Sequence, residues 1–393
     1  MDINIEVQYL CIKQEYVRGI PYYIKNLTEA LAFRNKNTYA LSFFDYGRER
    51  NNREYIFRYI DKDAISRLTL NECNDLSYKA FFDGYILGST TNYDNRTYED
   101  YIGKTYDIIH FPSVFSIPQN VKGNTLVTVH DVIPCMPGFR TNWTEESQEV
   151  FLRSIDYIKE NAAITIISDS YSTKNDLVDQ LGFDGNRIHV VPLAVDDKNL
   201  FYDPDISTLK SMGIEGEFIL YLGALDPRKG IIDIITAFAQ IKSRYADLKL
   251  VLAGGTEKIF EEQLQKALSE SEYRNDIILT GYVSEKQKRV LLSYAEIFLF
   301  PSEYEGFGIP VLEAMKCKTP VITTKVSSLP EVGGDAVVYI TPNQPEELSE
   351  AVCDLLGDTE KRVLLSKMGL KQCENFSWDK TAAMTEEVYQ KLC

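Results

Sequence analysis

The sequence lacks the features that mark several large protein classes. No apolar run reaches the roughly 18 residues that a membrane-spanning helix needs. Residues 1–10, MDINIEVQYL, alternate as in a strand and carry no basic region or cleavage site, so we expect no signal peptide. No predicted strand is followed by G-x-G-x-x-G, which excludes a Rossmann dehydrogenase. Internal repeats and low-complexity tracts are absent as well.

Basic residues and histidines are also scarce. The chain has 42 lysines and arginines against 58 aspartates and glutamates, a formal net charge of −16, and only three histidines. This balance argues against a general nucleic-acid-binding protein and leaves room only for a local basic site. The seven cysteines are scattered without a C-x-x-C pair, so we expect free thiols in a reducing cytosol. They are Cys11, Cys73, Cys135, Cys317, Cys353, Cys373 and Cys393.

The chain is long enough for two domains, because 393 residues exceed one comfortable hydrophobic core. Short apolar runs alternate with amphipathic stretches, which is the pattern of α/β folding with parallel sheets. The stretch DDKNLFYDPDIST has no periodicity and places a linker near residues 196–212. We therefore expect two doubly wound domains, over residues 1–196 and 212–376. Ligands of such sheets bind at the carboxyl ends of the strands, so two facing domains predict one cleft between them.

Apolar runs and helical periodicity locate the individual elements. In the first half we expect strands at residues 3–10, 39–44, 107–111, 126–130, 164–168 and 188–191, and helices at 22–33, 145–160 and 172–181. In the second half we expect strands at residues 218–222, 248–253, 277–279, 297–300, 321–324 and 337–340, and helices at 231–244, 260–269, 285–293, 311–316 and 345–356. Residues 47–103, rich in Tyr, Asn and Asp, are not assigned.

The stretch EGFGIPVLE, residues 305–313, places two glutamates eight positions apart behind a buried strand. A continuous helix would bring Glu305 and Glu313 to one face, but the glycines and Pro310 between them disfavour it. The expected geometry is a strand through Phe300, a glycine loop, and a helix starting near Pro310. Free backbone N–H groups would then lie between two carboxylates, which predicts an anion site.

A second stretch, FILYLGALDPRKGIIDIITAF at residues 218–238, places a basic pair before another helix. A buried strand ends at Gly223, Arg228 and Lys229 follow, and Gly230 opens the helix. The N–H groups of a first helical turn attract phosphate oxygens, and the two cations add to this attraction. On its own, the pair reads equally well as an exposed basic loop. Two such loops at one sheet edge suit a diphosphate with a polyhydroxyl group nearby.

Together these motifs resemble the retaining glycosyltransferases of family 4, which have the GT-B fold. The signature of that family is a pair of glutamates separated by seven residues, and Glu305 and Glu313 fit it. The resemblance spans nearly the whole chain, through RGIPYYIKNL (18–27), VTVHDVIP (127–134), SDSYSTKNDL (168–177), HVVPLAVD (189–196), LTGYVSEKQ (279–287), SSLPEVGGDA (327–336) and NFSWDKTA (375–382).

The resemblance implies a role for each matching residue. Arg228 and Lys229 neutralise the donor diphosphate, Glu305 contacts the ring hydroxyls of the transferred sugar, and Glu313 binds the ribose hydroxyls. The other donor-binding positions are backbone amides or base contacts. They are Gly19 and Gly223 near the diphosphate, Phe307, Gly308 and Ile309 at the sugar, Val311 and Leu312 at the phosphate, and Tyr282 and Val283 at the base.

One position departs from the family pattern. Where the family often has a second glycine or similar small residue in the first loop, this chain has Pro21, which donates no N–H. The phosphate contact of that loop is therefore in doubt. The resemblance also implies that the N-terminal domain binds the acceptor and the C-terminal domain the nucleotide-sugar. A C-terminal helix at about residues 377–393 could pack back on the N-terminal domain.

The histidines are weighed separately. His130 ends a predicted strand, and its position alone favours a structural role, whereas the resemblance places it beside the sugar as a catalytic residue. His110 and Asp131, which follows His130, are expected near the acceptor, and His189 is expected to be structural. The stretch GRERNNREYIFRY holds Arg48, Arg50, Arg53 and Arg58. It could meet an anionic acceptor or a membrane surface, although the interleaved glutamates favour a solvated face.

The resemblance thus implies an enzyme that moves a hexose from a nucleotide-sugar to a hydroxyl with retention at the anomeric carbon. The stretches VHDVIP, PSEYEGFGIPVLEAM and SSLPEVGGDA resemble members that transfer mannose or rhamnose, which implies GDP-mannose ahead of UDP- and dTDP-sugars and a glycan or lipid-linked acceptor in surface polysaccharide or glycoconjugate biosynthesis. Catalysis without a metal ion is expected in the cytoplasm, with peripheral membrane contact left open. The alternatives are a sugar-nucleotide epimerase of GT-B-like fold and a non-catalytic nucleotide-sugar-binding subunit. Attack by Glu305 and front-face attack both remain open.

Overall fold

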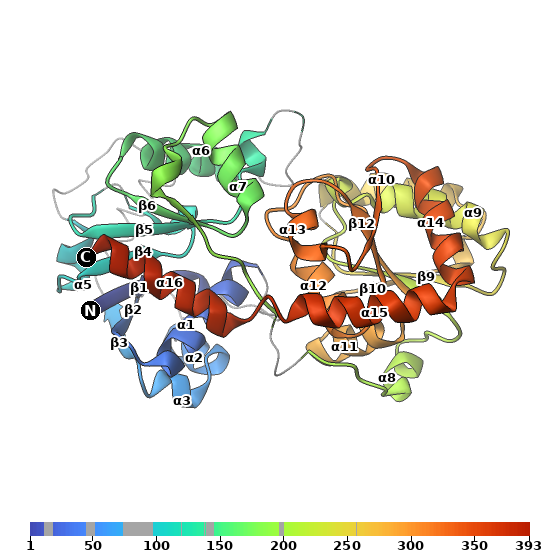
Figure 1. The fold of residues 1–393 in the computed structure, drawn as a ribbon, viewed down its shortest axis with the longest axis horizontal. Helices are drawn as coiled ribbons and strands as arrows, with labels where there is room; N and C mark the ends of the chain where they lie inside the picture. The colour runs from blue at the N-terminus through green and yellow to red at the C-terminus, as the bar shows by residue number, and fades with distance from the viewer. Residues whose placement is uncertain are drawn as a thin grey trace. The chain divides into compact units, whose positions relative to one another are not determined.

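A computed structural model describes residues 1–11, 19–44, 52–73, 97–118, 120–136, 138, 145–195, 200–256 and 258–393. The chain divides into two compact units, which are Met1–Leu193 with Trp378–Cys393, and Ala194–Ser377. Each unit contains one parallel sheet with helices between its strands (Figure 1). The predicted α/β class with two doubly wound domains is confirmed.

The first unit has a parallel sheet of order β3-β2-β1-β4-β5-β6-β7. Its strands are β1 (Asp2–Glu6), β2 (Thr38–Phe44), β3 (Thr69–Cys73), β4 (Ile108–Phe111), β5 (Asn124–Val129), β6 (Thr165–Ser168) and β7 (Ile188–Val190). The chain runs outward from β1 in one direction and from β4 in the other. Because crossovers are right-handed, the two runs put their helices on opposite faces of the sheet.

The helices of the first unit follow this rule. They are α1 (Ile20–Arg34), α2 (Asn52–Tyr59), α3 (Lys62–Ile65), α5 (Tyr98–Ile102), α6 (Glu145–Glu160), α7 (Tyr171–Asn175) and α16 (Trp378–Leu392). Figure 1 shows α1, α2 and α3 gathered apart from α6 and α7. Gly19 caps α1 with φ of 58°, and Pro21 lies in the first turn, where its missing N–H costs nothing.

The second unit has a parallel sheet of order β10-β9-β8-β11-β12-β13. Its strands are β8 (Phe218–Leu222), β9 (Lys249–Ala253), β10 (Ile277–Gly281), β11 (Ile297–Phe300), β12 (Val321–Thr324) and β13 (Val338–Ile340). Its helices are α8 (Ile206–Ser211), α9 (Ile231–Lys242), α10 (Lys258–Glu270), α11 (Glu285–Tyr294), α12 (Ile309–Lys316), α13 (Leu329–Gly333), α14 (Pro345–Gly357) and α15 (Thr359–Cys373). The strands β8, β11 and β12 are buried along their whole length, as expected for strands covered on both faces.

Several predicted elements differ from the observed ones. The first strand ends at Glu6, because residues Gln8–Cys11 form a 3-10 helix rather than continuing the strand. The predicted helix at 172–181 is α-helical only to Asn175 and continues as a π turn. The sequence did not predict β3, α2, α3 and α5, which lie in the unassigned segment, nor α8, α13 and α15. No helix in the described part of the chain combines the length and apolar character needed to cross a bilayer.

The arginine cluster is described only in part. Arg48 and Arg50 lie outside the described residues, as does the side chain of Arg53. Arg58 is exposed in the last turn of α2. The described residues therefore do not test whether this cluster is a solvated face, as the interleaved glutamates favour, or binds an anionic partner.

The C-terminal helix α16 packs against α1 in the first unit (Figure 1). Arg34 on α1 donates from Nε to Glu386 and from Nη1 to Asp379, both at 2.8 Å. The hydroxyl of Tyr389 lies 2.8 Å from Nδ1 of His110, whose Nε2 lies 2.9 Å from Thr128 Oγ1. A chain of buried polar contacts thus joins α16 to the centre of the sheet.

We expect the substitution Tyr389→Phe to destabilise the protein by about 1–3 kcal/mol, because it leaves a buried ring nitrogen of His110 without a partner. Urea unfolding followed by circular dichroism measures the loss. The control is Tyr171→Phe, which makes the same change on an exposed side chain of α7. Equal midpoints for the two variants would show that the His110–Tyr389 contact contributes nothing.

Candidate active site

The loop between β8 and α9 presents two cations at the carboxyl end of β8. Asp226 caps a short 3-10 helix, Pro227–Lys229, by accepting a hydrogen bond from the Arg228 N–H at 2.9 Å. Gly230 follows with φ of 69° and begins α9. A Cβ atom at Gly230 would lie 2.6 Å from the carbonyl oxygen of Pro301, so only glycine permits this close approach. Arg228 and Lys229 are therefore fixed directly before the N-terminus of α9.

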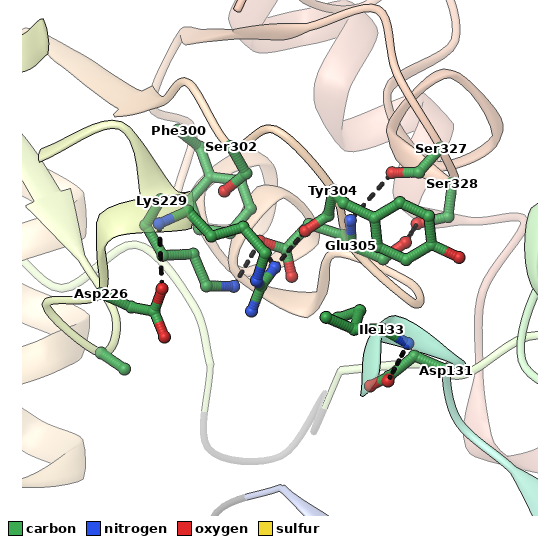
Figure 2. A network of polar contacts seen from close by, with 12 residues as sticks. Asp131, Ile133, Asp226, Lys229, Phe300, Ser302, Tyr304, Glu305, Ser327 and Ser328 are labelled. Carbon is green, nitrogen blue, oxygen red and sulfur yellow. Dashed lines mark hydrogen bonds and ion pairs between the residues drawn. The ribbon is translucent and has the colours of Figure 1, made fainter. Parts of the chain in front are cut away.

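The loop between β11 and α12 is held by two serines that follow β12. Ser328 Oγ lies 2.9 Å from the Glu305 carbonyl oxygen and 2.8 Å from that of Phe307. Ser327 Oγ accepts the Glu305 N–H at 2.9 Å (Figure 2). Ser327 has φ of 46°, a left-handed conformation that is strained for any residue with a side chain. The sequence motif SSLPEVGGDA contained both serines but did not reveal this contact, which depends on the fold.

The two loops meet in a buried ion cluster. Lys229 Nζ contacts Glu305 Oε1, and Arg228 Nη1 lies 3.6 Å from the same oxygen. Arg228 also donates to the Tyr304 carbonyl oxygen, and the Lys229 ammonium lies 5.2 Å above the ring of Phe300. Figure 2 shows Lys229 and Glu305 approaching from the two neighbouring loops. Three residues that the sequence assigned to donor binding are therefore in contact.

Burial and charge act against each other in this cluster. Burial raises the pKa of Glu305, but the charges of Lys229 and Arg228 outweigh it and lower that pKa below its ordinary value. Burial also lowers the pKa of Lys229, and the Glu305 carboxylate offsets this only in part. Glu305 is thus an ionised carboxylate shared by two cations. Such a group can accept hydroxyl hydrogens, while the cations can hold an anionic oxygen.

Other expected donor positions also belong to the second unit. Glu313 is buried on α12, where its Oε1 lies 2.6 Å from Nζ of Lys288, a residue that sequence reasoning missed. Tyr282 follows β10 with 61% of its surface exposed, and Val283 beside it is buried. Gly223 follows β8 and donates its N–H to Ala253 at 3.0 Å.

The backbone of α12 corrects one expectation. The N–H of Val311, which the resemblance assigned to phosphate, donates to the Gly308 carbonyl oxygen at 3.0 Å. Since that hydrogen bond closes the first turn of α12, Val311 does not offer a free amide. Gly308 has φ of 104° and caps the helix, and Ile309 is its first residue. Phe307 and Leu312 are buried on either side of this turn.

His130 lies at the end of β5 in the first unit and has both ring nitrogens occupied. Nδ1 lies 2.6 Å from Asp169 Oδ2, and Nε2 lies 3.0 Å from the carbonyl oxygen of Pro112. Burial lowers the pKa of His130, but the charge and hydrogen bond of Asp169 outweigh it and raise the pKa. Both ring nitrogens face oxygen atoms, an arrangement that favours the doubly protonated, cationic ring. Asp169 was not identified from the sequence, because its partner lies 39 residues away.

The prediction that His110 contacts an acceptor is wrong. Its side chain is fully buried, and both ring nitrogens are bonded within the protein core. Burial lowers the pKa of His110 to about 3, so the ring is neutral. Asp131 accepts the Ile133 N–H at 3.1 Å and is only partly buried (Figure 2). Among the described residues, a Cβ atom at Gly19 would meet nothing within 4 Å, and the Gly19 carbonyl oxygen accepts the Tyr23 N–H at 3.1 Å.

Acidic and thiol side chains do not gather into a metal site in the described residues. No group of three or more His, Cys, Asp or Glu side chains there could hold a metal ion. The cysteines in these residues are free thiols, and most are buried.

Comparison with known proteins adds to this geometry. Residues 211–372 match the family described as Glycosyl transferases group 1. The chain is 28% identical over 309 residues to the O-antigen chain mannosyltransferase B of Escherichia coli. The aligned region covers 76% of each protein. It is 29% identical over 290 residues to the serotype-specific mannosyltransferase WbdA of Escherichia coli, covering 70% of this chain but 35% of that relative.

Among solved structures, sucrose-phosphate synthase from Thermosynechococcus elongatus superposes with a TM-score of 0.76 at 20% identity. The superposition covers 100% of this chain and 98% of that chain. The fold is therefore GT-B, as the sequence motifs predicted. The match over residues 211–372 confirms the resemblance to glycosyltransferases in the second unit, where the ion cluster lies.

One further carboxyl group lies at the carboxyl end of the first sheet. Glu6 ends β1 with 2% of its surface exposed, and its Oε1 accepts the Gln8 N–H at 2.8 Å. Within the described residues, its Oε2 is buried without a hydrogen-bond partner. Burial raises the pKa of Glu6 to about 7.

We expect Glu6 to make the protein less stable as pH rises. Its folded pKa lies above its unfolded value of 4.5, so its contribution is fully present below pH 4.5 and is lost as pH rises through 7. Ionisation of Glu6 should lower the free energy of unfolding by about 3 kcal/mol over this pH range. The variant Glu6→Gln cannot ionise, so its free energy of urea unfolding should depend less on pH than that of wild type. Glu160→Gln, the same exchange at an exposed position of α6, is the control. Parallel pH profiles for wild type and Glu6→Gln would contradict the assignment.

Proposed function

We propose that this chain is a retaining glycosyltransferase of family 4 that transfers mannose from a nucleotide-sugar to a hydroxyl of a glycan or lipid-linked acceptor. The observation that carries the proposal is the Arg228–Lys229–Glu305 cluster. It joins the loops after β8 and β11 inside the region that matches Glycosyl transferases group 1. The E-x7-E spacing of Glu305 and Glu313 supports the family assignment.

The cluster suits the charge changes of glycosyl transfer. Cleavage of the donor bond builds positive charge on the sugar ring and negative charge on the leaving diphosphate. Arg228, Lys229 and the N-terminus of α9 can stabilise the leaving group. The ionised Glu305 can accept sugar hydroxyls and stabilise the ring cation. Because His130 has both ring protons committed to Asp169 and Pro112, it acts in this scheme as a fixed positive charge rather than a proton shuttle.

The names of the relatives favour mannose as the transferred sugar. Both Escherichia coli relatives are mannosyltransferases, and one acts on an O-antigen chain. The proposed donor is therefore GDP-mannose, in preference to UDP- or dTDP-sugars, and the proposed acceptor is a surface polysaccharide or its lipid-linked precursor. Such an acceptor would bring the enzyme to the inner face of the membrane. No specific contact favours an epimerase or a silent binding subunit.

A donor screen tests the proposal. Incubation with GDP-mannose and a mannosylated oligosaccharide should extend the acceptor by one mannose, and proton NMR of the first product should show the anomeric configuration of the donor. UDP- and dTDP-hexoses serve as parallel donors. An inverted linkage would overturn the family assignment. Interconversion of sugar-nucleotides without an acceptor would instead identify an epimerase.

We expect turnover to proceed in excess EDTA and to depend on Lys229. Two cations and a helix N-terminus supply the charge that a divalent metal would otherwise bring to the diphosphate. Lys229→Ala should therefore lower the rate by at least about two orders of magnitude, and added Mg²⁺ should not restore it. The control is Lys266→Ala, on the exposed surface of α10. Loss of activity in EDTA with recovery in Mn²⁺ would show that the diphosphate site is wrongly assigned.

A further inference from the structure

Lys288 occupies a place that its own helix disfavours. Ser284 and Gln287 form a capping box at the start of α11, and the Lys288 N–H donates to the Ser284 carbonyl oxygen at 2.8 Å. The ammonium therefore belongs to the first turn, at the positive end of the helix dipole. Lys288 is also 8% exposed, and burying a charged group costs free energy. Helix formation alone does not explain a lysine here.

Two carboxylates offset these costs. Lys288 Nζ lies 2.6 Å from Glu313 Oε1 on α12 and 2.8 Å from Glu285 Oε2 one turn earlier on its own helix. Burial lowers the pKa of Lys288, but the two glutamates outweigh it and raise the pKa well above its ordinary value. Glu285 is largely exposed, whereas Glu313 is buried with Lys288. The contact between α11 and α12 is thus a buried ion pair.

Buried ion pairs add little to stability, because desolvation offsets most of their attraction. What such a pair does supply is a fixed geometry and a fixed charge. The ammonium 2.6 Å from Oε1 fixes the orientation of the Glu313 carboxylate. An ionised carboxylate is an acceptor only, and it can receive hydrogen bonds from two neighbouring hydroxyls. The ammonium also reduces the repulsion between Glu313 and a diphosphate in the same site.

We propose that Lys288 is a positioning residue that makes Glu313 selective for the vicinal diol of a ribose. This inference rests on the proposed function, in which Glu313 binds the ribose of the donor. The site would then discriminate between ribonucleotide and 2′-deoxyribonucleotide donors. GDP- and UDP-sugars carry the diol, whereas dTDP-sugars lack the 2′-hydroxyl. By positioning Glu313, Lys288 therefore favours ribonucleotide-sugar donors over dTDP-sugars.

The test compares nucleotide affinities by calorimetry on the full chain. GDP and UDP are titrated first, followed by the 2′-deoxy form of whichever binds more tightly. Wild type should bind the deoxy form at least about 10-fold more weakly, the scale of one hydrogen bond to a charged group. Lys288→Met should weaken the ribonucleotide about 10-fold and bring the two affinities within about 3-fold. Lys288→Arg, which keeps the charge, should retain most of the discrimination.

Two further variants separate positioning from general damage. Glu313→Gln should lose the same discrimination, and the double variant Lys288→Met/Glu313→Gln should lose little more, because the two residues act together. Lys286→Met removes a neighbouring exposed lysine of α11, which pairs with Asp205, and should leave the affinity ratio unchanged.

The outcomes distinguish this inference from the proposed function. If wild type binds neither GDP nor UDP, the proposed function is wrong. If wild type binds GDP or UDP and its 2′-deoxy form with equal affinity, the site does not recognise the ribose diol, and the inference is wrong whatever the variants show. If Lys288→Met folds and keeps the wild-type ratio, Glu313 does not depend on Lys288.

Discussion

The hydrogen-bonded pairing of β8 with β11 is the constraint on which the candidate site depends. These strands are neighbours in the sheet although β9 and β10 lie between them in the chain. Because the sheet is parallel, both strands end at the same edge, and the loops after them meet. Lys229 and Glu305 come into contact in this way across 76 residues of sequence. Any change that separated the two strands would separate the cations from the carboxylate.

The loops at this edge are fixed by contacts that cost stability as well as by contacts that add to it. Ser327 holds the Glu305 backbone while adopting a left-handed conformation, and Glu305 and Lys288 bury charges. Sites that bind charged ligands commonly depart from the lowest local energy, because ligand and protein groups must be preorganised. The surrounding strands β8, β11 and β12 are fully buried and supply the rigid frame. The second unit thus places a left-handed serine and buried charges where the proposed chemistry takes place.

The first unit uses buried polar groups differently. His110 links the C-terminal helix to Thr128, whose hydroxyl lies 3.0 Å from that of Tyr23, and the Tyr23 ring packs edge-on against His130. A neutral histidine and a charged one therefore lie close together, and their different hydrogen-bond partners give them different charge states. Hydroxyls surround His110, whereas a carboxylate and a carbonyl surround His130. Environment rather than residue type decides which of the two carries a charge.

The sequence by itself determined the features that depend on near neighbours in the chain. The strands at 218–222, 297–300 and 321–324 were predicted with their observed bounds, since short runs rich in apolar, β-branched and aromatic residues favour buried strands. The sequence also identified Arg228, Lys229, Glu305 and Glu313 as candidate site residues. It did so because glycine and proline positions indicate where a strand ends and the next helix begins.

Only the tertiary structure decided which of these residues touch, and what else they touch. The burial of His110, the Asp169 partner of His130 and the Lys288 partner of Glu313 all join residues from different elements. Lys288 lies in the polar stretch EKQK at the start of the helix predicted at residues 285–293, and nothing local marks it as buried. Periodicity and turn chemistry act over a few residues, whereas burial and ion pairing depend on which strands become neighbours. That choice is made by the packing of the whole sheet.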